Sequence, residues 1–122
     1  VPAAAVSSIN GAYPNAGPIE WDSEMHGMER IYEAEFRING FQFDVKIAPD
    51  GKIVRIKEEI AASSLPEAVR ASVLKRYPGC RIKEAEKITE GELVRYKVEV
   101  ADSRDDYDVL IAPDGNILHV DR

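Results

Sequence analysis

Three side chains that bind soft metal ions stand within four positions, in the segment Met25-His26-Gly27-Met28. Two thioethers and one imidazole are ligands that suit copper(I). The central glycine is also typical of a tight, exposed hairpin turn, which needs no metal to explain it. The turn is the simpler interpretation, so the sequence predicts neither a metal site nor a cofactor.

Nucleophilic catalysis requires an activated serine or cysteine beside a base. The single cysteine, Cys80, follows an expected helix, whereas a thiol is activated at the start of a helix. The two histidines, His26 in an expected loop and His119 near the C-terminal end, do not stand near it in the sequence. We therefore expect Cys80 to be a small buried side chain, and we expect the chain not to be an enzyme.

Paired carboxylates occur twice, at Glu33 with Glu35 and at Glu84 with Glu86. General acid–base catalysis needs one member of such a pair in an apolar pocket with a raised pKa. Basic residues alternate with these carboxylates along the chain, which favours a solvated face of mixed charge instead.

The composition supports a small globular protein that does not bind nucleic acid. The chain has 122 residues, 44% of them hydrophobic and 31% charged, with a net charge of −6. A surplus of acid disfavours phosphate binding, and no apolar run reaches the roughly 20 residues that span a bilayer. The start at Val1-Pro2-Ala3 fits a cleaved secretory signal, although a trimmed chain would look the same.

An internal repeat organises the whole sequence. The segment Ile47-Ala48-Pro49-Asp50-Gly51 recurs as residues 111–115, an offset of 64 residues. At this one offset, with no gaps, 17 of 58 positions are identical between residues 1–58 and 65–122. We interpret the chain as a tandem duplication, with one repeat in each of these two ranges and both repeats in one compact domain.

Each repeat is expected to open with a helix. In the second repeat Ser64 and Glu67 are spaced as a capping box, and Leu65, Val69 and Val73 form an apolar stripe that Tyr77 extends. The equivalent stripe in the first repeat runs from Val1 through Ala5 and Ile9 to Tyr13.

Four strands should follow each helix. The first is expected at about 18–24 and 81–88, and the second and third alternate apolar and polar residues, as at 32–38 and 41–47. Asn39-Gly40 and the two Ala-Pro-Asp-Gly segments are typical of hairpin turns. The fourth strand is expected to bury Val54 and Ile56, and its copy Leu118 and Val120.

The sequence therefore predicts an α+β fold made by tandem duplication of an αβ4 unit. The antiparallel sheet should have about eight strands, with both helices packed on one face. Two separate small sheets would satisfy the same pattern. The other face would be left polar in either case.

Several of these residues resemble a known family. Trp21, the Tyr32–Phe36 strand, the two Ala-Pro-Asp-Gly turns and the Leu65–Val69 segment leading to Tyr77-Pro78 are similar to the PepSY-like proteins. These are small exported bacterial proteins with the fold of the beta-lactamase inhibitory protein. The resemblance implies a tandem αβ4 arrangement, a periplasmic or lipid-anchored location and a role as a binding or inhibitory module.

We expect this chain to be a noncatalytic exported module that binds a protein partner with the polar sheet face, as an inhibitor or regulator of an envelope or secreted enzyme. A structural, self-assembling envelope protein is the alternative, because edge strands invite pairing. Trp21 would be either a core residue or an exposed binding anchor. The expected contact residues are Trp21, Glu33, Glu35, Arg37, Asp44, Lys46, Arg55, Arg95, Lys97 and Glu99.

Overall fold

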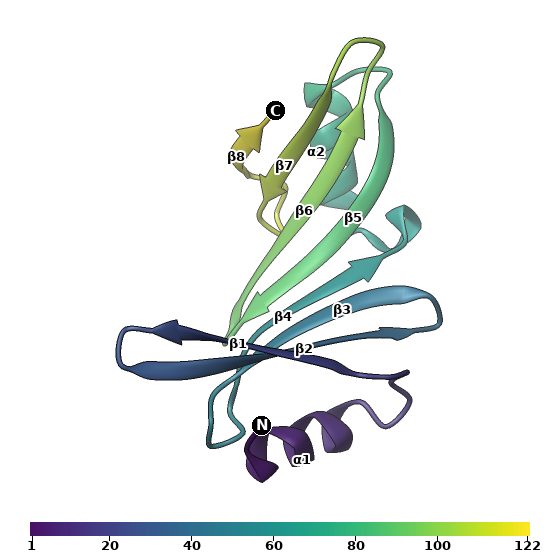
Figure 1. Ribbon diagram of the computed structural model, residues 1–122. Coiled ribbons are helices and arrows are strands. Elements are labelled where there is room, and N and C mark those ends of the chain that lie inside the picture. The colour runs from purple at the N-terminus through teal and green to yellow at the C-terminus, as the bar shows by residue number, and fades with distance from the viewer. The chain divides into compact units, whose positions relative to one another are not determined.

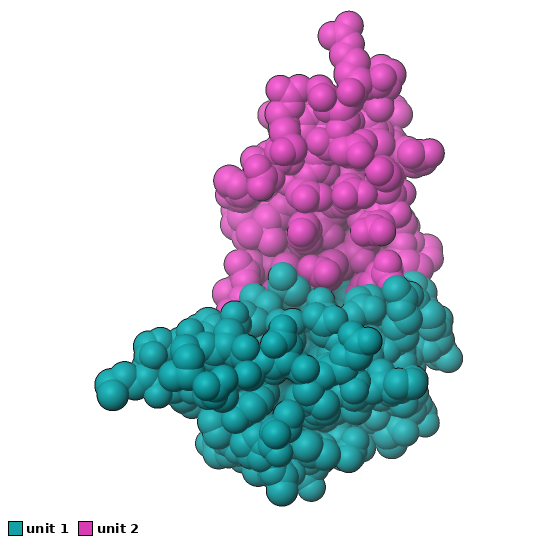
Figure 2. All heavy atoms as spheres, in the orientation of Figure 1, with its two compact units in different colours: residues 1–58 teal, residues 59–122 magenta.

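The computed structural model describes residues 1–122, which form two compact units, residues 1–58 and 59–122 (Figure 2). Two α-helices and eight antiparallel strands make the chain α+β, as predicted (Figure 1). The elements of the first unit are α1 (Ala3–Ala12), β1 (Glu20–His26), β2 (Glu29–Ile38), β3 (Phe41–Ile47) and most of β4 (Ile53–Ile60), whose last two residues belong to the second unit. The second unit contains the 3-10 turn η1 (Ala62–Ser64), α2 (Glu67–Arg76), β5 (Arg81–Glu90), β6 (Leu93–Ala101), β7 (Asp106–Ile111) and β8 (Ile117–Asp121).

Short hairpins connect the strands, so strands that follow each other in a unit also pair with each other. Asn39 and Gly40 both have positive φ, 52° and 84°, which confirms the two-residue turn between β2 and β3. In the next turn the N–H of Gly51 donates to the carbonyl of Ala48 over 2.9 Å, and Gly51 has a φ of 92°. The predicted Ala-Pro-Asp-Gly turn is thereby confirmed.

In each unit the helix covers one face of the strands and makes the core with it. In the first unit Ala5 and Ile9 of α1 pack on four side chains of β2 and β3, namely Ala34, Phe36, Val45 and Ile47. The second core contains the residues 64 positions further on, Val69, Val73, Val98, Val100, Val109 and Ile111, together with Leu65, Ala85 and Tyr96. All six first-unit core positions are therefore core positions again in the second unit. The two α-helices also differ by 64 residues at both ends. Duplication as the origin of this match stays a prediction.

The expected burial of Val54 and Leu118 is wrong. Val54 is 41% exposed and Leu118 is 47% exposed, whereas Ile53 and Ile117 pack against the cores. The cause is an irregularity in the pairing between Lys46 and Ile47, which recurs between Leu110 and Ile111. A bulge adds a residue to one side of a ladder, so the simple alternation fails where β4 and β8 begin.

The expected capping box at Ser64 is also wrong. Ser64 ends the 3-10 turn η1, and α2 begins at Glu67 after Pro66, with no side-chain cap. The fixed φ of proline suits the position before the first helical residue, and Glu67 places a negative charge in the first turn of the helix. Proline and an acidic first turn therefore start this helix in place of a serine cap.

Candidate functional site

The face of the first unit opposite α1 carries rows of charged side chains. Paired residues on neighbouring strands point to the same side, and Glu33 of β2 pairs with Lys46 of β3, which pairs with Arg55 of β4. Two residues further along β2, and therefore on the same face, Glu35 pairs with Asp44. The structure thus brings these predicted residues together on one face, which we call the polar face of the first unit.

An ion pair and a hydrogen bond order one side of this polar face. The Nζ atom of Lys46 lies 2.6 Å from Oε1 of Glu24, and Nε2 of His26 lies 3.0 Å from the same oxygen. The hydrogen bond from Lys46, followed by that from His26, lowers the pKa of Glu24 to about 2. Glu24 is therefore ionised at neutral pH and accepts hydrogen bonds from both neighbours.

The pKa of Glu35 is shifted in the opposite direction to that of Glu24, because its neighbours are carboxylates. A hydrogen bond with Glu33 raises the pKa of Glu35, and the negative charges of Asp44 and Glu20 raise it further. No cation lies in ion-pair distance of Glu35. This part of the polar face has like charges held close together.

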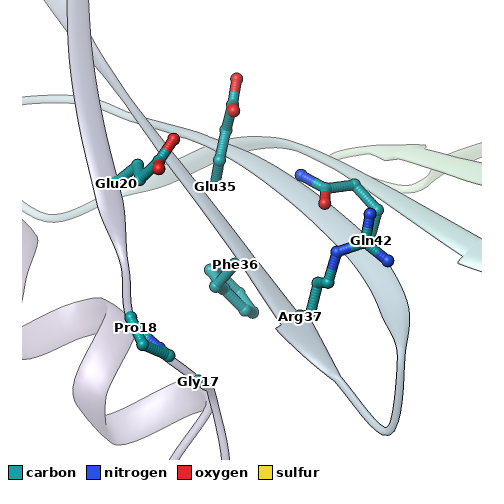
Figure 3. A pocket seen from close by; sticks show the side chains of 7 residues that line it. All are labelled: Gly17, Pro18, Glu20, Glu35, Phe36, Arg37 and Gln42. Atoms are coloured by element: carbon teal, nitrogen blue, oxygen red, sulfur yellow. The ribbon is translucent and has the colours of Figure 1, made fainter.

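A pocket of about 270 Å³ opens at this crowded end of the face (Figure 3). Its lining residues come from the segment before β1 and from β1, β2 and β3: Gly17, Pro18, Glu20, Glu35, Phe36, Arg37 and Gln42. Figure 3 shows the carboxylates of Glu20 and Glu35 on one side of the strands and the ring of Phe36 on the other. The guanidinium of Arg37 donates to the carbonyl of Gly40 over 3.0 Å. The amide of Gln42 donates to Asp44 over 3.1 Å.

The polar face of the second unit is built in the same way from β6 and β7. Glu99 pairs with Asp108, and Lys97 approaches that aspartate to 3.9 Å. Arg95 forms an ion pair with Glu90 on the neighbouring strand β5. Acidic and basic groups therefore neutralise each other here, as expected from their alternation in the sequence.

Trp21 does not lie with the charged residues. It pairs with Ala34 and packs, partly buried, against the core of the first unit. Since paired residues share a face, Trp21 points to the side that α1 covers. The structure therefore agrees with the interpretation of Trp21 as a core residue and not with that of an exposed binding anchor.

The sequence analysis missed Glu20 and Gln42, which complete the pocket beside Glu35 and Arg37. The signal for Gln42 was the turn at Asn39-Gly40, because a two-residue hairpin places position 42 opposite position 37. Glu20 could have been found by extending the alternation into the first strand, where it pairs with Glu35.

Cys80 is half-buried, packs against the core of the second unit and forms no disulfide. Burial raises the pKa of its thiol, which opposes a nucleophilic role. No group of three or more histidine, cysteine, aspartate or glutamate side chains is placed to hold a metal ion. Neither helix is long and apolar enough to cross a membrane.

Comparisons with known proteins place this geometry in a structural class. No family model matches the chain, and no curated protein resembles it significantly. Several crystal structures do share its fold over almost the whole chain. A candidate periplasmic protein from Bacteroides eggerthii is 21% identical over 99% of this chain and 88% of its own, with a TM-score of 0.81.

Two further structures carry family descriptions. A DUF2874 family protein from Bacteroides uniformis is 22% identical over 99% of this chain and 88% of its own, with a TM-score of 0.80. A BLIP-like protein from Bacteroides fragilis is 21% identical over 99% of this chain and 86% of its own, with a TM-score of 0.75. The chain therefore has the fold of BLIP-like and DUF2874 proteins, and the names of these proteins state no catalytic activity.

Proposed function

We propose that this chain is a noncatalytic, exported module that binds a protein partner with the polar faces of its strands. The partner in this proposal is an envelope or secreted enzyme, which the module inhibits or regulates. The observation that carries the proposal is the face opposite α1, where Glu33, Glu35, Asp44 and Lys46 are brought together on a side that this helix leaves open.

The chemistry of this face suits recognition of a protein. Protein interfaces combine charged groups, whose complementarity selects the partner, with concave sites that anchor single side chains. The first unit offers both, because the pocket beside Glu35 and Arg37 lies at the end of the charged rows. The charges in the second unit, Arg95, Lys97 and Glu99, extend the set of proposed contacts.

Export and family membership are part of the proposal. The BLIP-like and candidate periplasmic proteins support it by sharing the fold, and the PepSY-like resemblance of the sequence points the same way. Regulation of an enzyme is proposed from that resemblance. A periplasmic location would give the module access to envelope and secreted enzymes.

Charge reversal on the polar face tests the proposal. The bait variant Glu35→Lys/Arg37→Glu exchanges one acid and one base at the pocket without a change in net charge. The matched control, Lys52→Glu/Glu92→Lys, makes the same exchange at exposed residues of two hairpin turns. Circular dichroism should confirm that both variants are folded before they are used.

With the protein at micromolar concentration, envelope extract of the source organism should yield a partner for the wild type and for the turn variant. The face variant should retain at least tenfold less of it. Equal retention by the face variant, or no partner above background for the wild type, would contradict the proposal. Light scattering over a concentration series distinguishes binding of a different protein from self-assembly, in which the captured partner is a second copy of the chain.

A further inference from the structure

The turn between β1 and β2 holds both methionines of the protein and one of its two histidines. The chain contains two methionines, two histidines and one cysteine. Both methionines and one histidine fall in the four residues Met25-His26-Gly27-Met28, which we call the hairpin tip. Such a concentration is unexpected if the tip serves only to reverse the chain, because glycine alone suffices for that.

The two thioethers lie outside both hydrophobic cores. Methionine normally fills irregular gaps in cores, yet Met28 is fully exposed at 101% and Met25 is 55% exposed. Neither side chain contributes to the hydrophobic clusters of the two units. Figure 1 shows the hairpin extending away from α1, with the tip at its end. The thioethers are therefore available to a ligand.

His26 makes a hydrogen bond that is typical of metal-binding histidines. Such a histidine usually donates its second ring N–H to a carboxylate, which fixes the ring and its tautomer. Nε2 of His26 lies 3.0 Å from Glu24, which is itself held by Lys46 at 2.6 Å. An ionised carboxylate can only accept, so Nε2 carries the proton and the lone pair of neutral His26 is on Nδ1.

The turn geometry keeps His26 and Met28 within reach of each other. His26 pairs with Glu29, so Gly27 and Met28 are the two residues of a tight turn, with φ of Gly27 at 64°. Met28 is thus two residues from His26 and has a long, unbranched side chain. Met25 leaves the strand on the other side, since successive side chains alternate, and its thioether must come round the hairpin end to join them.

We propose that the hairpin tip binds a soft monovalent cation, copper(I), through Nδ1 of His26 and the thioether sulfurs of Met28 and Met25. Thioethers select copper(I) over hard cations, and two or three soft ligands meet the low coordination number that this ion accepts. Glu24 is a positioning residue, which holds the imidazole ring without touching the metal. This inference is independent of the proposed function.

Silver(I) is the probe, because it has the same ligand preference without copper's redox chemistry. The Cys80→Ser background removes the one thiol, which would otherwise compete for the ion. Silver(I) titrated into this protein should bind one equivalent and shift the methyl carbon and proton resonances of both methionines. Zn²⁺ at the same concentration should leave those methyl resonances in place.

Substitutions in the same background assign the ligands. Met28→Leu and His26→Ala should each weaken silver(I) binding at least tenfold, and both positions are exposed, so the fold should persist. Glu24→Gln should weaken binding less and should change the His26 ring resonances. His119→Ala is the matched control and should bind as the background does. An unchanged affinity in both Met28→Leu and His26→Ala, or no binding of one equivalent, would overturn the proposal.

Discussion

The carbonyl oxygen of Ala4 lies where a side chain on Gly51 would have to begin. A Cβ atom added to Gly51 would stand 2.8 Å from that oxygen. The same relationship holds in the second unit, where a Cβ on Gly115 would stand 2.7 Å from the carbonyl oxygen of Ala68. The turn after the third strand of each unit therefore touches the helix backbone directly, and glycine makes this contact possible.

The substitution Gly51→Ala should destabilise the protein by about 2 kcal/mol or more. Two costs add up: the positive φ of 92° strains an L-residue, and the new methyl group collides with the backbone of α1. Urea unfolding followed by circular dichroism measures the loss.

Gly11→Ala is the matched control for that experiment. Gly11 lies in α1, and an added Cβ would have no neighbour within 4 Å. Alanine is the better helix former by about 1 kcal/mol, so this variant should be more stable than the wild type. If Gly51→Ala also leaves the unfolding midpoint unchanged or raises it, the close approach of turn and helix is wrong.

Alanine substitutions at two valines test which of the two side chains is in the core. Val45 is fully buried and Val54 is 41% exposed. Val45→Ala should cost about 2 kcal/mol, through lost apolar burial and the cavity left behind. Val54→Ala should change the stability by less than about 0.5 kcal/mol. Chemical denaturation measures the free energy of unfolding of both variants. An equal loss of stability in the two would mean that Val54 is buried, as the simple alternation predicts.

Two glutamates on the same polar face should affect stability with opposite signs. The folded-state pKa of Glu35 is raised by Glu33 and its acidic neighbours, so its contribution to stability is present at low pH and is lost as pH rises through that pKa. Glu35→Gln should therefore be more stable than the wild type at pH 7. The difference should shrink as the pH falls, because Glu35 becomes protonated and loses the charge that its acidic neighbours repel.

Glu24 supplies the opposite case. Its pKa is lowered from 4.5 to about 2, mainly by the hydrogen bond from Lys46, so its contribution is present at neutral pH and is lost as the pH falls from 4.5 toward 2. Glu24→Gln should be less stable than the wild type at pH 7. Melting temperatures measured between pH 2 and 7 test both variants, and shifts of the same sign at pH 7 would refute the assignment.

Cys80 should react slowly with thiol reagents in the folded protein. Burial raises its pKa, so less thiolate is present at pH 8 than for an ordinary cysteine, and the neighbouring core restricts access. The rate of labelling by a chromogenic disulfide reagent should rise at least tenfold in denaturing urea. A folded-state rate equal to the denatured-state rate would place this thiol at the surface.

The sequence repeat was the strongest guide to the fold, because apolar positions that recur at a fixed offset mark core positions twice. Ile9 and Val73 illustrate this, since each is fully buried in the core of its own unit. The first residues of β4 could not be placed in the same way. Their facing depends on the bulge in β4, where Val54 is the extra residue between the partners of Lys46 and Ile47, and the sequence alternation around Val54 does not mark it.

The candidate site was predictable in part. Alternation placed Glu33 and Glu35 on one face, and the hairpin turn placed Asp44 and Lys46 opposite them. The pocket was not predictable, because it depends on how Gly17 and Pro18 lead into β1. The side on which Trp21 lies was also open, since an isolated aromatic residue fits either face until the register with Ala34 is known.

Both methionines of the chain lie at the hairpin tip, so neither core contains a thioether. Peroxide would therefore convert only surface side chains to sulfoxides, and no sulfoxide would form inside either core. The fold should survive oxidative stress that damages methionine-rich cores, and any function located at the tip would be lost first and regained when a sulfoxide reductase acts.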